Sequence, residues 1–252
     1  MTGPGASDRG VSEVLGFVLV FALIVMTIGV VYASGFSGLY HAQQNEQLQN
    51  MERAFDVFDN NIDDISERGA PNRATEIKLA EGSLEFRDPV RVTVYAENSA
   101  DSSENVTFSM TTEPIAFVRD DTAIVFDQGG VIRSQRAGSA MVAEPRWIVD
   151  SQRVLLPFVE THRTGEYQSL PGGRTVLVVA SRQSRGMAGS FDPAAGVVVN
   201  VTIETDTPDA WNQYLRSEGF TITTDKAGLV AGEVTTGTLY VPRTKIDVEF
   251  RH

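Results

Sequence analysis

An uncharged apolar run extends from Val14 to Ala33, and Thr27 is its only clearly polar side chain. A helix of that length, rising about 1.5 Å per residue, spans roughly 30 Å, which matches the hydrocarbon thickness of a bilayer. The apolar region of a discarded secretory signal is shorter, about 7 to 15 residues. The pattern therefore favours a retained membrane-spanning helix, with removal as an ordinary signal peptide as the alternative.

Helical periodicity continues past the apolar run, over residues 35–69. Apolar side chains recur there at intervals of three and four, which places them on one face of a helix. They are Leu48, Met51, Phe55, Phe58, Ile62 and Ile65. Gly69 and Pro71 are typical residues at the end of a helix. We expect this stripe to pack either on the chain's own globular part or, as a packing seam, against a neighbouring subunit.

The period changes to two over residues 70–252. Strand-like segments separated by Gly, Asp, Asn and Pro occur at residues 75–86, 91–98, 104–112, 123–133, 174–183, 197–206 and 238–250. Alternation such as that of Val199, Val201 and Ile203 with their polar neighbours is typical of antiparallel sheets that have one solvated face. These segments predict a mainly antiparallel β head, arranged as a sandwich or as a stack of meanders.

One short helix is expected to interrupt the strands. Thr207 is a candidate N-cap, Pro208 suits the first turn, and Gly219 marks the end. Trp211 lies on the apolar face of this helix, and we interpret it as a core residue. The whole pattern predicts an α+β chain with a long N-terminal α-helix, membrane-spanning and then amphipathic, followed by the β head with its short helix.

The excess of acidic over basic residues limits the kinds of molecule that the protein is expected to bind. The formal net charge is −12, and three of the 21 basic residues are lysines. An acidic chain with few lysines is expected to stay hydrated in concentrated salt, so we interpret the protein as halophilic. The acidity argues against nucleic acid as a partner, because phosphate binding needs clustered Lys and Arg. The chain has no cysteine, which excludes disulfides and zinc–thiolate sites.

The sequence contains few motifs of catalytic, cofactor-binding or metal-binding sites. The sequence has no nucleophile elbow, phosphate-binding loop or zinc-protease motif, so we expect no enzyme, no cofactor and no metal. The pairs Asp63–Asp64 and Asp120–Asp121 are interpreted as solvated surface or turn residues, as is usual in so acidic a chain. Asn105 and Asn200 each begin an Asn-Val-Thr sequence, which is an acceptor for N-glycosylation if the side chain faces solvent.

The segment RGVSEVLG, residues 9–16, opens the apolar helix and resembles the start of archaeal type IV pilins. The resemblance covers about the first 40 residues. It implies that a membrane prepilin peptidase cuts a class III signal peptide between Gly10 and Val11, so that the helix is retained. Ser12 and Glu13 then lie at the helix start. Glu13 is similar to the acidic residue that assists assembly in bacterial pilins, although a carboxylate at a helix start also needs no special role.

The resemblance implies a division into a cytoplasmic leader (1–10), a transmembrane pilin-type helix (11–34), an amphipathic extension (35–69) and an extracellular head (70–252). Arg9 precedes the apolar run and Arg53 is the first basic residue after it, which favours a single-pass protein with a cytoplasmic N-terminus. The expected function is that of a subunit or minor component of a type IV pilus-like filament in cell adhesion. Its partners would be the membrane, prepilin peptidase and copies of itself or other pilins. The alternative is a non-polymerising, membrane-anchored extracellular domain that binds an unidentified ligand.

Overall fold

The computed structural model describes residues 7–252, without the side chains of residues 7–12, 33–41 and 44. Helix α1 is continuous over Ser7–Ser66. The chain divides into two compact units, Met1–Gln49 and Asn50–His252. Residues 1–6 of the predicted leader and the side chains of Val11 and Ser12 lie outside the described part. The backbone of Ser12 lies within α1 rather than at its first residue.

The first unit contains one segment that is long and apolar enough to cross a membrane. It runs from Glu13 to Tyr32, and none of it is buried inside the chain. The Glu13 side chain, at the start of this segment, is exposed. An N-terminal apolar helix is thus confirmed, and its length is compatible with a membrane anchor or a signal sequence.

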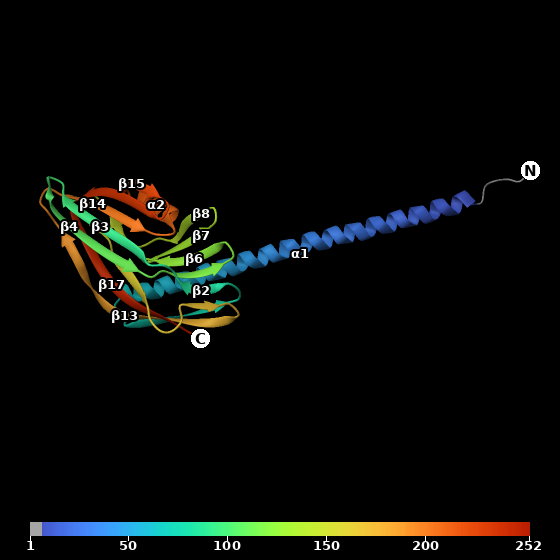
Figure 1. Ribbon diagram of the computed structural model, residues 1–252, viewed down its shortest axis with the longest axis horizontal. Coiled ribbons are helices and arrows are strands. Elements are labelled where there is room, and N and C mark those ends of the chain that lie inside the picture. The colour runs from blue at the N-terminus through green and yellow to red at the C-terminus, as the bar shows by residue number, and fades with distance from the viewer. Residues whose placement is uncertain (1–6) are drawn as a thin grey trace, which may run out of the picture. The chain divides into compact units, whose positions relative to one another are not determined.

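The second unit, which we call the head, contains residues 50–66 of α1, the short helix α2 (Pro208–Ser217) and three β-sheets (Figure 1). The first sheet has the order β1 (Asn72–Leu79), β13 (Arg174–Phe191), β17 (Thr238–Arg251), β10 (Arg153–Leu155), β9 (Ile148–Val149), with β11 (Phe158–Arg163) also paired to β17. The second has the order β12 (Ser169–Pro171), β2 (Ser83–Phe86), β5 (Ile115–Arg119), β6 (Thr122–Asp127), β7 (Gly130–Gln135), β8 (Gly138–Ala143). The third has the order β15 (Thr221–Lys226), β16 (Leu229–Thr236), β14 (Val197–Glu204), β3 (Val90–Asn98), β4 (Asp101–Thr112).

Most strand pairs are antiparallel, which confirms the predicted α+β class with a mainly antiparallel head. The exceptions are β10 and β11, which both pair with β17 in parallel. In the third sheet the alternation is as predicted, because Val199, Val201 and Ile203 are buried while the intervening side chains of β14 are more exposed.

Helix α2 packs on the inner side of the third sheet, beside β15 and β8 (Figure 1). Trp211, Tyr214 and Leu215 are fully buried there, which confirms Trp211 as a core residue. Gly219, with φ 91°, follows the end of this helix as expected. The capping prediction for Thr207 is wrong in one respect. Thr207 occupies the N-cap position, but its hydroxyl pairs with that of Thr205 at 3.1 Å and makes no capping hydrogen bond.

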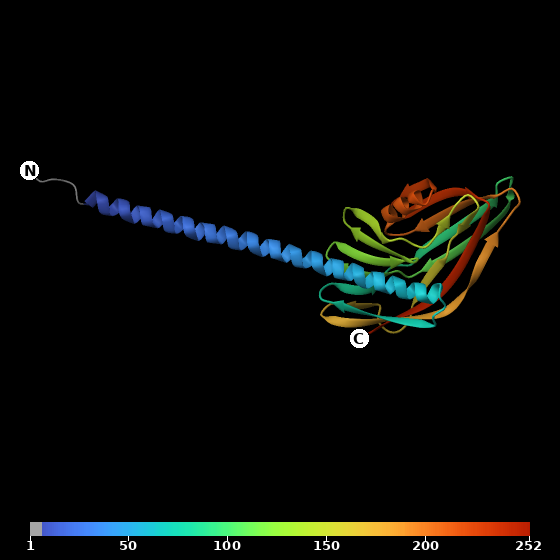
Figure 2. The same cartoon turned by 180° about the vertical axis from the view of Figure 1, so that it is seen from behind.

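The middle strands of the second sheet, β5 and β6, are buried on both faces, which corrects the expectation of one solvated face. In β6, Ala123 and Val125 join the core that contains α2. Phe126 points to the opposite face, where its ring meets that of Phe58 edge to face at 5.0 Å. Residues 50–66 of α1, which we call the docked segment, thus cover this second face (Figure 2).

The docked segment places the predicted apolar stripe inside the head. Its five members Met51, Phe55, Phe58, Ile62 and Ile65 are buried. The sixth, Leu48, belongs to the first unit and is partly exposed. Polar contacts fix the segment on two sheets, since Glu52 pairs with Arg133 of β7 at 3.0 Å and Asn61 donates to the Thr75 hydroxyl of β1 at 2.9 Å.

Candidate functional site

The head contains a cavity of about 550 Å³ at the C-terminal end of the docked segment. Five regions line it: the last turn of α1, the turn between β6 and β7, residues 146–148, residues 155–159, and the neighbouring parts of β13 and β17. This volume lies in the usual range for small-molecule sites, about 300 to 1,000 Å³.

Gln128 enters the cavity from the turn between β6 and β7. The two loop residues, Gln128 and Gly129, have φ values of 53° and 78°, and Asp127 pairs with Gly130 across the turn. Two positive φ angles are typical of a type I′ hairpin turn, which favours Asn or Gly, whereas glutamine rarely adopts this backbone. Gln128 is 1% exposed, and neither its amide oxygen nor its amide nitrogen has a hydrogen-bond partner among the described residues.

Trp147 forms the aromatic wall of the cavity. The Tyr214 hydroxyl and the Trp147 backbone N–H both donate to the carbonyl of Pro145 at 2.9 Å, which fixes this segment against α2. The Trp147 ring meets those of Tyr214 and Phe158 in edge-type contacts at 5.5 and 6.0 Å. Its side chain is 6% exposed, and its indole N–H has no partner within the described part of the chain.

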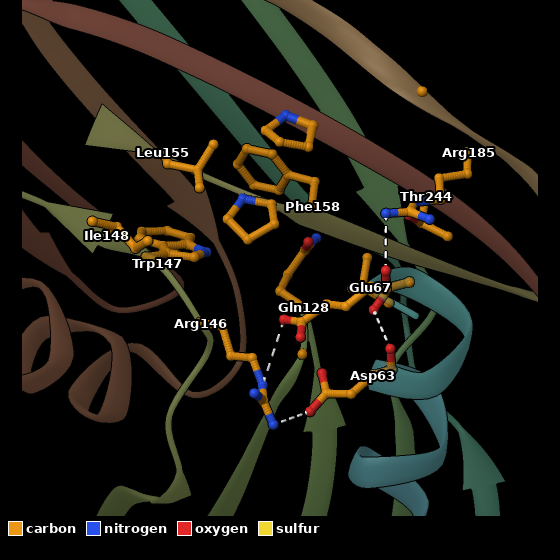
Figure 3. A pocket seen from close by; sticks show the side chains of 16 residues that line it. Asp63, Glu67, Gln128, Arg146, Trp147, Ile148, Leu155, Phe158, Arg185 and Thr244 are labelled. Atoms are coloured by element: carbon orange, nitrogen blue, oxygen red, sulfur yellow. Dashed lines mark hydrogen bonds and ion pairs between the residues drawn. The ribbon is translucent and has the colours of Figure 1, made fainter. Parts of the chain in front are cut away.

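Figure 3 shows how these groups face one another. The amide end of Gln128 points toward the Phe158 ring, and the indole nitrogen of Trp147 lies on the side of its ring that faces the same space. The cavity therefore combines apolar walls with a donor from Trp147 and both a donor and an acceptor from Gln128.

Two acidic and two basic side chains line the opposite side. Arg146 forms a close ion pair with Asp63 and lies 3.6 Å from Glu67. Arg185 donates to the backbone carbonyl of Glu67 at 3.0 Å, which satisfies one of the free carbonyls at the end of α1. The carboxylates of Asp63 and Glu67 thus lie beside two guanidinium groups, those of Arg146 and Arg185. The formal charges of these four side chains sum to zero.

Asp63 is buried, so its interpretation as a solvated surface residue is wrong. Burial raises its pKa above the usual value, and the nearby Arg146 opposes this. Asp64, on the next position of the helix, is partly exposed and pairs with Arg73 at 2.9 Å. Asp120 and Asp121 are both exposed, as expected.

Two further buried carboxyls lie near the cavity. Burial raises the pKa of Asp59 to about 7, and the neighbouring Asp63 adds to this shift. Burial also raises the pKa of Asp127 to about 7. The Trp211 indole N–H lowers the pKa of Asp127 by less, and its geometry falls short of a hydrogen bond.

The residues singled out in the sequence lie elsewhere. Asn105 and Asn200 both belong to the third sheet, where Asn105 faces Glu97 of β3 and Asn200 faces Tyr95 two residues along the same strand. Their side chains share the outer face of that sheet, with Asn105 exposed and Asn200 partly exposed. Among the side chains that the structure describes, no three or more His, Asp or Glu residues are placed to hold a metal ion.

The cavity residues Gln128, Arg146 and Trp147 were not predicted from the sequence. One local signal was present, because a glutamine occupies a turn position at which asparagine is favoured. Arg146 and Trp147 lie in an irregular segment without a periodic pattern.

Comparison with protein families matches residues 9–249 to a family of unknown function (DUF7289). The chain therefore belongs to this family. Comparison with the curated proteins and comparison with the solved structures each gave no match.

Proposed function

We propose that this member of the family is a pilin-like surface protein. Its N-terminal helix would be retained in the membrane or in a type IV pilus-like filament, and its acidic head would lie outside the cell and act in surface attachment. The observation that carries this proposal is the continuity of α1, whose backbone is helical from the apolar segment to the core of the head.

The apolar segment of α1 needs an apolar environment that its own chain does not supply. Phe17, Leu19 and Met26 are each about two-thirds or more exposed, and every side chain from Glu13 to Tyr32 is exposed. So large an apolar surface marks contact with a membrane or with other protein. A bilayer satisfies it before assembly, and the equivalent helices of neighbouring subunits could satisfy it in a filament.

The resemblance of residues 9–16 to pilin starts supplies the remaining steps of the proposal. Prepilin peptidase would cut between Gly10 and Val11 on the cytoplasmic side, which leaves Glu13 close to the new N-terminus. With the N-terminus inside, Asn105 and Asn200 would lie outside the cell, on the face of the third sheet where a glycan could be attached. The acidic surface would keep the head soluble in concentrated salt.

Processing at Gly10 is tested by the variant Gly10→Leu. We expect N-terminal sequencing of the unmodified protein from membranes to begin at Val11, and the variant to keep its original N-terminus because a large side chain blocks the peptidase. Gly16→Leu is the matched control, since a Cβ added at Gly16 has no neighbour within 4 Å beyond the adjacent backbone of its own helix, and the variant should leave processing unchanged.

Other N-termini contradict the proposal in distinct ways. An unmodified protein that begins at Met1 or Thr2 is not processed as a pilin. One that begins near Gly35 has lost its apolar segment by ordinary secretion.

The cavity in the head favours a second candidate, a membrane-anchored binding domain that does not polymerise. Shearing of cells distinguishes the two. A filament subunit is released in long fibres that electron microscopy detects, whereas an anchored monomer stays in the membrane fraction.

A further inference from the structure

We infer that the cavity lined by Gln128 and Trp147 binds a neutral, hydroxyl-rich ligand of the size of a mono- or disaccharide. This site belongs to the head alone, and it does not depend on whether the chains assemble into filaments.

Unpartnered polar groups indicate that the cavity binds a ligand. Buried polar atoms in folded proteins almost always have hydrogen-bond partners, and each exception needs an explanation. Here Gln128 and Trp147 line one cavity, and three of their polar atoms lack partners among the described residues. A bound ligand with both acceptors and donors would satisfy the indole N–H and both ends of the amide.

The backbone at Gln128 supports the same inference. A non-glycine residue with a left-handed φ is strained because its Cβ lies too close to the following carbonyl oxygen, and asparagine or glycine would relieve the strain at this turn. The longer glutamine instead extends its amide into the cavity, toward Phe158 (Figure 3). Strained residues of this kind cluster at binding sites.

The charges in the cavity select a neutral ligand. Arg146 is already paired with Asp63 and Glu67, and Arg185 is bonded to the end of α1. A ligand with a net charge would have to break one of these pairs or remain unpaired, which is costly at a partly buried site.

The positions of the polar groups favour hydroxyl groups over a single amide. Gln128, Trp147, Ser66 and Thr244 come from four different walls of the cavity. A lone peptide group would satisfy Gln128 but could not reach the other walls. Hydroxyl groups around a sugar ring both donate and accept in several directions, and the C–H surface of the ring could pack against Phe158 and the neighbouring prolines.

Ligand binding is tested with the full chain in detergent, titrated with a panel of uncharged mono- and disaccharides. Trp147 and Trp211 are the two tryptophans of the chain, and their rings lie 5.8 Å apart, so occupancy of the cavity should change the tryptophan fluorescence. We expect saturable binding of at least one neutral sugar. Its uronic acid and amino-sugar counterparts should bind at least about 10-fold more weakly.

The variant Gln128→Met keeps the length of the side chain and removes both hydrogen-bonding ends. We expect it to weaken sugar binding by about 10-fold or more, since one good hydrogen bond to a buried group is worth about that factor. Its melting temperature should not fall, which shows that the head remains folded. Gln135→Met, at an exposed glutamine of β7, is the matched control and should bind as the unmodified chain does.

Three results would overturn the inference. They are no saturable binding by any sugar of the panel, equal affinity in the Gln128→Met variant, and binding of N-acetylglycinamide in place of the sugars. The last result would assign the cavity to a peptide ligand.

Discussion

Replacing Phe58 with alanine is expected to lower the free energy of unfolding of the head by about 3 to 5 kcal/mol. Phe58 is 2% exposed, and its ring fills the face of the second sheet that the docked segment covers. Removing it leaves a void against Phe126 that the surrounding strands cannot close. Guanidinium unfolding of the full chain in detergent measures this change, because both tryptophans lie in the head and report its unfolding.

Val57→Ala is the control for this experiment. Val57 is adjacent to Phe58 on the same helix but 53% exposed, so its truncation should change the free energy of unfolding by less than about 0.5 kcal/mol. A small effect of Phe58→Ala combined with a large effect of Val57→Ala would indicate that another subunit, not the head, covers this part of α1.

The stability of the head is expected to fall as the pH rises from about 4 to 7. Folded Asp127 keeps its proton up to a pH of about 7 because burial raises its pKa, while in the unfolded chain an aspartate releases its proton near pH 4. The folded state therefore binds more protons than the unfolded state in this window. The stabilisation that protonated Asp127 gives to the folded state is complete below the pKa of Asp127 in the unfolded chain. It is lost above the pKa of Asp127 in the folded chain. Asp59, whose pKa is raised in the same direction, adds to the fall.

Asp127→Asn should remove much of this dependence. The amide is nearly isosteric with the carboxyl and carries no charge at any pH. A shift of about three pKa units corresponds to roughly 4 kcal/mol, so we expect the variant to gain up to that amount of stability at pH 8 and little at pH 4. Denaturant unfolding at both pH values measures the difference, with Asp225→Asn at an exposed strand position as the control. Parallel pH profiles for Asp127→Asn and the unmodified chain would contradict this assignment.

The features predicted correctly are those with a long, regular period. The apolar run of α1, the alternation in β14 and the apolar face of α2 each repeat over several residues, so local sequence is sufficient to identify them. Strands β9, β10 and β12 contain only two or three residues, which is too short for a period to appear. The parallel pairing of β10 and β11 with β17 depends on residues about 85 positions away, and the local pattern carries no trace of it.

The two-sided burial of β6 is indicated by the local sequence. Residues 123–126 form the unbroken apolar run Ala-Ile-Val-Phe, and such a run is typical of a strand covered on both faces. What the sequence cannot identify is the partner on the second face. That partner is the docked segment, whose Phe58 precedes Phe126 by more than sixty residues.

The cavity is the part least accessible to sequence analysis. It brings together Asp63, Gln128, Arg146 and Arg185, which lie in four separate segments without a shared motif. The functional interest of Gln128 comes from its lack of hydrogen-bond partners among the described residues and from its positive φ angle, and both are properties of the folded chain. Local sequence indicates the unusual glutamine at the turn between β6 and β7, but not the cavity that it lines.

The position of β17 constrains the order in which the head can be completed during synthesis. This strand pairs with β10, β11 and β13, yet it spans Thr238–Arg251 and is synthesised after all the other described strands of the head. Until it arrives, β13 is left with β1 as its sheet partner, and β10 and β11 lack their neighbour on β17. Contacts between distant parts of a chain also form slowly. The head therefore closes only after synthesis has reached residue 251, long after the apolar helix has emerged, so the unfinished strands need protection from aggregation in that interval.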